Sequence, residues 1–277
     1  MRFIKKKRVV LLLVILCLIL ARHINNKNQV FYEPEYKRAD ISETIRCENI
    51  SDDEYLFIYK QTGVSPYAAR EFIKKEEFSV LERLNKLYFE KPEAKLDYIF
   101  YPFTAVEINS AQTTPIVDLK NGDILITFNT HTLDWRHGHC GLVVDAEKGI
   151  LLEHMSVGET SCLTDARDWG SYPAFLVLRH RNEAIAAKAA DFAYKNLVDV
   201  NYNIFAGLIN KDKSKSSTID SSHCSHIVWQ AYKALDVDLD YNGGGIVTPR
   251  EISLSDVLEV VQIYGIDPKD YADRIMK

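Results

Sequence analysis

The sequence predicts an α+β fold in which an antiparallel sheet packs against helices. Helical periodicity covers residues 41–89 and returns at residues 183–197, while residues 123–179 between them hold short β-branched and apolar runs separated by turn signals. Of the 277 residues, 47% are hydrophobic and 26% are charged. This composition is typical of a globular chain that can bury a sizeable core.

Residues 1–21 predict a signal anchor or a signal peptide. The basic run Lys5-Lys6-Lys7-Arg8 precedes uninterrupted apolar residues from Val9 to Ala21, which is the order of an export signal. Ile19 stands where a signal cleaved after Ala21 would carry a small residue, so a retained anchor is favoured. The positive-inside rule then places the rest of the chain outside the inner or cytoplasmic membrane. Cleavage, giving a secreted or periplasmic protein, is the alternative.

Two further regions precede the main domain. Residues 22–40 are polar and without period, which predicts a tether. Residues 41–100 predict a small helical subdomain, with helices expected at Ser51–Gln61, Pro66–Lys74 and Glu77–Tyr88. The aromatic stretch Tyr98 to Thr104 fits either a strand or a packing loop.

Residues 101–277 predict one larger domain. After the turn dipeptide Asn121-Gly122, four strands of one antiparallel sheet are expected at Asp123–Phe128, His139–Asp145, Ile150–Ser156 and Phe175–Arg179. An alanine-rich helix at Glu183–Leu197, a polar loop, a helix containing Cys224 and a helical region from Thr248 follow. The segments Asn129–Gly138 and Asn210–Ser222 are expected to be loops.

Charge and cysteine content exclude several classes. The net charge of -5 and the absence of a basic run beyond the terminus argue against nucleic acid as a partner. The five cysteines are too few and too irregularly spaced for a disulfide framework or a paired-cysteine zinc site. Cys47 and Cys162 could pair in an oxidising compartment.

Cys224 is the candidate nucleophile. It precedes an apolar stripe typical of a core-facing helix, and Asp220, Ser221 and Ser222 are candidate N-caps. A cysteine in the first helical turn lies near unpaired backbone N–H groups and the positive end of the helix dipole, which favour the reactive thiolate. A buried core cysteine is the alternative interpretation.

A nucleophilic cysteine needs a base and a group that orients the base. His139 is the best-placed base because it opens a predicted strand, with Gly138 and Gly141 leaving room beside it. On the next strand, Glu153 and His154 must point to opposite faces. A three-residue loop with a bulge, in which Gly149 supplies the positive φ, puts Glu153 on the His139 face; a four-residue loop would choose His154.

These residues resemble the circularly permuted papain-like branch of the NlpC superfamily, to which bacterial YiiX/YebB-like proteins belong. In that branch the histidine and the polar third residue precede the cysteine, as here. The resemblance covers about residues 115–255 and rests on Gly122-Asp123-Ile124, His139 to Val144, Leu152-Glu153, Tyr202 to Phe205, Cys224 to Tyr232 and Val247-Thr248-Pro249.

The resemblance implies a permuted papain-like catalytic domain with Cys224 as nucleophile, His139 as base and Glu153 as orienting residue. It implies a hydrolase of the amidase or peptidase kind that needs no cofactor and acts through a thioacyl-enzyme on a cell-envelope amide, either a peptidoglycan peptide or a lipid-linked substrate. Tyr202 is a candidate for the substrate cleft. Acyltransferases of the lecithin:retinol type use a second histidine as third residue, which keeps His154 open.

Three alternatives remain. The first is an acyltransferase or lipid esterase that uses the same cysteine and histidine. The second is a metal site with the candidate ligands His137, His139, Cys140, His223, Cys224 and His226. His223 and His226 share a helical face from which Cys224 points away, so one ion could not easily bind all of these ligands. The third is a non-catalytic envelope-binding module. The sequence does not predict the oligomeric state.

Overall fold

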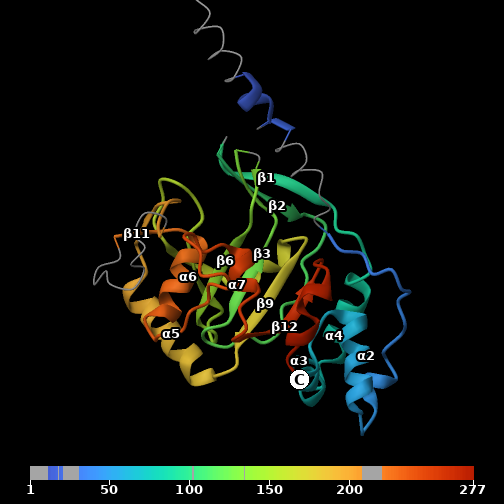
Figure 1. The fold of residues 1–277 in the computed structure, drawn as a ribbon. Coiled ribbons are helices and arrows are strands. Elements are labelled where there is room, and N and C mark those ends of the chain that lie inside the picture. The colour runs from blue at the N-terminus through green and yellow to red at the C-terminus, as the bar shows by residue number, and fades with distance from the viewer. Residues whose placement is uncertain (1–11, 18, 21–30, 102, 134, 208–219) are drawn as a thin grey trace, which may run out of the picture.

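The computed structural model describes residues 12–17, 19–20, 31–101, 103–133, 135–207 and 220–277. It is an α+β structure in which helices flank antiparallel sheets, as predicted (Figure 1). Its central sheet has six strands in the order β12-β9-β3-β6-β7-β8, and every neighbouring pair is antiparallel.

The central sheet contains all four predicted strands and two that the sequence analysis missed. The predicted strands are β3 (Ile124–Thr127), β6 (His139–Asp145), β7 (Ile150–Glu153) and β9 (Phe175–His180). The missed strands are β8 (Cys162–Asp165) and β12 (Leu258–Tyr264). The helical region expected from Thr248 is only the short helix α7 (Pro249–Ser253) followed by β12, so that prediction was largely wrong.

Helices cover both faces of this sheet (Figure 1). Alternate residues along each strand face opposite sides, so Leu142 joins one apolar core and Val143 the other. The first core includes α5 (Glu183–Asn196) and α6 (Cys224–Lys233). The second includes α2 (Asp52–Thr62), α3 (Pro66–Lys74) and α4 (Phe78–Leu87). These three helices are therefore a layer of the main domain's core, where the sequence predicted a subdomain.

The helix starts at the N-terminal side follow the predicted signals. Ser51 and Glu54 form a capping box at the start of α2, and Ser65 caps α3 with Pro66 in its first turn. Three short 3-10 helices complete the helical elements: η1 (Thr44–Arg46), η2 (Ala166–Ser171) and η3 (Pro268–Arg274).

A second antiparallel sheet has the order β1-β2-β4-β5. Its strands are β1 (Ala94–Phe100), β2 (Thr104–Asn109), β4 (Thr130–Thr132) and β5 (Trp135–Arg136). The helical subdomain predicted up to residue 100 thus ends before β1, and the predicted loop 129–138 contains two strands. Glu107 on β2 holds this sheet together, because its carboxylate accepts hydrogen bonds from Asn129, His131 and Arg136 at 2.8, 2.8 and 2.5 Å.

The chain is fixed to the domain from Phe31 onward. The Phe31 ring packs edge-on against Tyr264 with centroids 5.8 Å apart, and the Tyr32 N–H donates to the Gly265 carbonyl at 2.8 Å. Residues 31–40, the second half of the predicted tether, therefore lie against the globular part. The ordered chain begins earlier in the sequence than predicted because β12 offers these residues an apolar surface.

The predicted N-terminal anchor lies partly outside the described residues. Residues 12–17 and 19–20 are helical and exposed. Within the parts of the chain that the structure describes, no helix combines the length and apolar character needed to cross a membrane.

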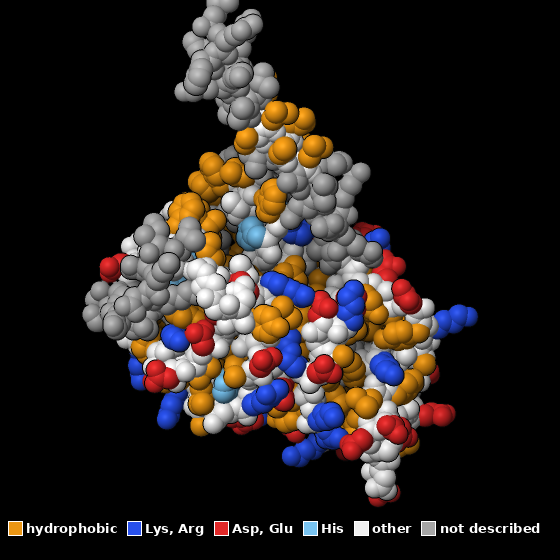
Figure 2. Space-filling model, in the orientation of Figure 1, with side chains coloured by type: hydrophobic (Ala, Val, Ile, Leu, Met, Phe, Trp, Pro, Cys, Tyr) orange, Lys and Arg blue, Asp and Glu red, His pale blue; other side chains and the backbone are white. Residues whose placement is uncertain are grey.

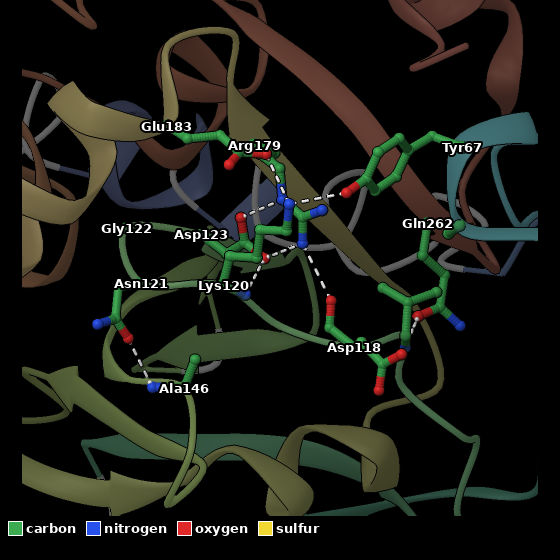
Figure 3. Close-up of polar contacts among 12 residues, drawn as sticks. Tyr67, Asp118, Lys120, Asn121, Gly122, Asp123, Ala146, Arg179, Glu183 and Gln262 are labelled. Carbon is green, nitrogen blue, oxygen red and sulfur yellow. Dashed lines mark hydrogen bonds and ion pairs between the residues drawn. The ribbon is translucent and has the colours of Figure 1, made fainter. Parts of the chain in front are cut away.

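A buried ion pair fixes the start of β3 (Figure 3). Asp123 accepts hydrogen bonds from Arg179 Nε at 2.8 Å, from Arg179 Nη2 at 2.6 Å and from the Lys120 N–H at 2.8 Å. Gly122 has a φ of 90°, and a Cβ there would lie 2.3 Å from the Ala186 carbonyl oxygen. The Gly122-Asp123 pair therefore clamps β3 to β9 and lets α5 approach the turn.

Candidate active site

His139 and Glu153 are joined by a hydrogen bond at the ends of neighbouring strands. His139 Nε2 lies 3.0 Å from Glu153 Oε1, and both side chains are buried. The register explains the contact: Leu142 pairs with Leu152, and Gly149 in the β6–β7 turn has a φ of 67°. Asp145 pairs with Ile150, so the β6–β7 loop has four residues and the expected three-residue loop was wrong. A bulge between Val143 and Asp145 restores the even register, which puts Glu153 on the face of His139 as predicted.

Two further side chains hold the Glu153 carboxylate. Trp169 Nε1 donates to Oε1 at 2.9 Å, and the Thr164 hydroxyl donates to Oε2. The Trp169 ring also stacks on the His139 ring, with centroids 5.6 Å apart and planes inclined by 23°. Imidazole and carboxylate are thus fixed together, which leaves His139 Nδ1 as the nitrogen free to meet a nucleophile.

Gly141 makes room for this arrangement. It lies two residues after His139 and therefore on the same face of β6. A Cβ at this position would lie 3.1 Å from Glu153 Cγ and 3.3 Å from Trp169 Cζ2. A side chain here would press on both partners of the histidine.

Cys224 is the first residue of α6. The cap is His223, whose side chain accepts from the His226 N–H, so the predicted caps Asp220, Ser221 and Ser222 were wrong. The physical reason is that Ser221 and Ser222 are extended and pair in parallel with Asn201 and Tyr202, as β11 and β10. Cys224 is 8% exposed and lies close enough to His139 for the two side chains to shift each other's pKa.

The electrostatics favour an ion pair between sulfur and imidazole. The hydrogen bond from Cys140, together with those from His139 and His223, lowers the pKa of Cys224 well below its usual value despite burial. Burial lowers the pKa of His139, but hydrogen bonds with Cys224 and Glu153 outweigh it and raise that pKa to about 10. At neutral pH the site therefore holds a thiolate beside an imidazolium.

The structure separates His154 from this triad. His154 lies on the opposite face of β7 from Glu153, buried edge-on against Tyr202 with ring centroids 4.9 Å apart. Burial lowers its pKa to about 4, so it is neutral at pH 7. The predicted cleft residue Tyr202 is in contact with His154, and burial, with a smaller effect of the Cys224 charge, raises the pKa of Tyr202.

The other cysteines and histidines do not form a metal centre in the described part of the chain. No group of three or more histidine, cysteine or acidic side chains there has an arrangement that could hold a metal ion. The His223 and His226 rings lie near each other, with centroids 5.5 Å apart and planes tilted by 35°. Cys47 and Cys162 are both free and exposed.

Sequence reasoning missed four residues of the site. Thr164 shares a face with Glu153 through the pairing of β8 with β7, and recognising β8 would have found it. Cys140 and His223 flank the two reacting residues in sequence, which was the available signal. Trp169 lies on a 3-10 helix after β8, and no local pattern indicates its contact with His139.

Comparison of the chain with protein-family models, with curated proteins and with solved structures finds no match. The function is therefore inferred from the residues of the site and their arrangement.

Proposed function

We propose that this protein is a cysteine-dependent hydrolase, of the amidase or peptidase kind, that acts on an amide of the cell envelope through a thioacyl-enzyme. The observation that carries the proposal is the buried chain of contacts from Cys224 through His139 to Glu153. A base oriented by a carboxylate beside a nucleophile is the arrangement that cysteine acyl transfer requires. The order of the three residues and the sheet flanked by α6 also support a permuted papain-like fold.

In the first half-reaction the Cys224 thiolate attacks the amide carbonyl carbon. The backbone N–H of Cys224, at the start of α6, is a donor for the oxyanion that forms. The His139 imidazolium then gives its proton to the leaving amine as the carbon–nitrogen bond breaks, and a thioester remains on Cys224.

In the second half-reaction the now neutral His139 takes a proton from water. The resulting hydroxide attacks the thioester carbonyl, the carbon–sulfur bond breaks, and the carboxylic acid product leaves the regenerated thiolate. Glu153 stays ionised throughout and stabilises each imidazolium, because hydrogen bonds from His139, Thr164 and Trp169 lower its pKa against the raising effect of burial.

The experiment is turnover of three substrate types by the full chain: murein peptides, N-acyl amino acids and phospholipids. We expect hydrolysis of one type by the wild type and by Cys47→Ala, a control at an exposed cysteine. Cys224→Ala should show no turnover, and intact-protein mass spectrometry should find an acyl group on wild-type Cys224.

Three results would contradict this proposal. Equal turnover by wild type and Cys224→Ala would exclude the thiol mechanism. Binding of an envelope component without any product would instead indicate a non-catalytic module. Transfer of the acyl group to an added alcohol or amine would assign the same site to an acyltransferase.

A further inference from the structure

The β1–β2 hairpin exposes large apolar side chains. All seven residues of β1 are exposed, including Leu96 and Phe100. At the turn, Tyr101 is 76% exposed and Phe103 43%. Large apolar residues are common on surfaces singly, but a contiguous group of them marks an interaction site.

The β4–β5 turn extends the same apolar surface. The Leu133 N–H donates to the Phe103 carbonyl at 2.8 Å, so the two turns lie side by side. Leu133 is 56% exposed and has a φ of 50°, a backbone conformation that is strained for a residue other than glycine. Trp135 beside it is 40% exposed. A strained leucine and a tryptophan held toward water suggest a use for the surface.

This surface lies at the end of the molecule from which residues 12–17 project (Figure 1). Figure 2 shows hydrophobic side chains gathered at that end, whereas charged side chains of both signs cover much of the opposite part of this view. Ten chain steps separate Ala21, the end of the apolar segment, from Phe31, which is docked on the domain. They can span at most about 35 Å, so an apolar segment in a bilayer keeps the domain next to it.

We propose that Leu96, Phe100, Tyr101, Phe103, Leu133 and Trp135, the aromatic turn patch, dock onto the surface of a lipid bilayer. Aromatic and aliphatic side chains at exposed turns suit the membrane interface, where tyrosine and tryptophan concentrate. Docking also covers β1, the edge strand of its sheet, where the backbone would otherwise be open to pairing with other chains.

The patch is connected to the active site through β2 and β5. Glu107 joins β2 to His131 and Arg136, and the chain runs from Arg136 through His137 into His139. Docking therefore holds the site at the lipid surface. Together with the proposed hydrolase function, on which this step rests, the patch selects an amphiphilic substrate: an amide that carries a long acyl chain and lies in the bilayer.

Tryptophan fluorescence tests docking directly. Of the three tryptophans, Trp135 is exposed while Trp169 and Trp229 are each 1% exposed, so lipid-borne quenchers reach Trp135 alone. The full chain is reconstituted in phosphatidylcholine vesicles with or without brominated acyl chains. We expect the brominated lipid to quench wild-type emission and to leave Trp135→Phe unquenched.

The double variant Phe100→Ser/Tyr101→Ser should lose most of this quenching. Tyr194→Ser, at a tyrosine on α5 that is 50% exposed, is the matched control and should keep it. Absence of wild-type quenching, or unchanged quenching in the double variant, would overturn the proposal. Self-association in detergent that the double variant abolishes would also overturn it, by assigning the patch to a second copy of the chain.

The substrate class is tested separately. We expect the double variant to hydrolyse a vesicle-borne long-chain N-acyl amide about tenfold more slowly than wild type, since two apolar contacts with lipid are lost, and a short soluble amide at the wild-type rate. Equal losses on both substrates would overturn the substrate assignment. Cys224→Ala should keep full quenching. If the wild type showed quenching but hydrolysed neither substrate, docking would stand and the hydrolase function alone would be rejected.

Discussion

The charge state of His139 depends on a carboxylate and on a thiol. Its Nε2 lies 3.0 Å from Glu153, and Cys224 and Glu153 both raise its pKa. Each partner stabilises the charged imidazole, and the charged imidazole stabilises the thiolate. Proton position in the resting site is therefore set by three residues acting together.

The lowered pKa of Cys224 predicts thiol reactivity at acidic pH. The thiolate exists above that lowered pKa, and the imidazolium persists until His139 deprotonates at about 10. We expect iodoacetamide to alkylate Cys224 at about pH 6, where an ordinary thiol with a pKa of about 8.5 is almost fully protonated. Peptide mass spectrometry against pH measures this. A rate that rises only near pH 8.5 would contradict the ion pair.

Removing the Glu153 charge should weaken His139 as a base and destabilise the ion pair of His139 with Cys224. In Glu153→Gln the pKa of His139 falls, so imidazolium is lost at lower pH and the alkaline limb of kcat/KM shifts toward neutrality. Turnover should fall by about 10²- to 10⁴-fold, as expected when an oriented histidine loses its carboxylate. A larger loss in His154→Gln than in Glu153→Gln would assign the orienting role to His154.

Among the elements, β6 and β7 position the base only because Gly141 lacks a side chain. In Gly141→Ala the new methyl group would press on Glu153 and Trp169. We expect turnover to fall by about tenfold or more, because small misplacement of catalytic groups is costly, while far-UV circular dichroism stays unchanged. Lys188→Ala, at an exposed position on α5, is the control. Equal activity of Gly141→Ala and wild type would show that the site does not depend on this clearance.

The ion pair of Asp123 with Arg179 clamps β3 to β9. Asp123→Asn leaves the Arg179 charge buried without its partner, and we expect a loss of about 3–5 kcal/mol in the free energy of unfolding. Asp145→Asn breaks an exposed pair with Lys148 and should cost below about 1 kcal/mol. Urea denaturation measures the free energy of unfolding of both variants. Similar losses in the two variants would show that the buried ion pair stabilises the fold no more than the exposed one.

For the whole molecule, the shared core predicts one unfolding transition. Leu84 on α4 is fully buried in the apolar core that also contains Val143 of the central sheet. Leu84→Ala should destabilise the protein by about 2–5 kcal/mol. Circular dichroism and tryptophan fluorescence should report the same shifted midpoint. Two separate transitions would restore the independent helical subdomain that the sequence suggested.

The sequence predicted best what local patterns determine. Capping at Ser51 and Ser65 depends on neighbouring residues. The expected register led correctly from His139 to Glu153, although a bulge near Val143 sets it and the expected loop length does not. By contrast, Trp169 reaches the site through packing between distant segments. The strand β12 was missed because the preceding Thr248 and Pro249 start a helix that ends within two turns. Tertiary contacts with β9 determine its conformation.

The docking of Phe31 on Tyr264 also governs the order in which the protein matures. These rings are 233 positions apart in the sequence. Until β12 has paired with β9, the chain lacks both the edge strand of its central sheet and the surface that receives Phe31. Contacts this distant in sequence form slowly. Residues 31–40 therefore take their final position late in folding, after the sheet to which they are fixed is complete.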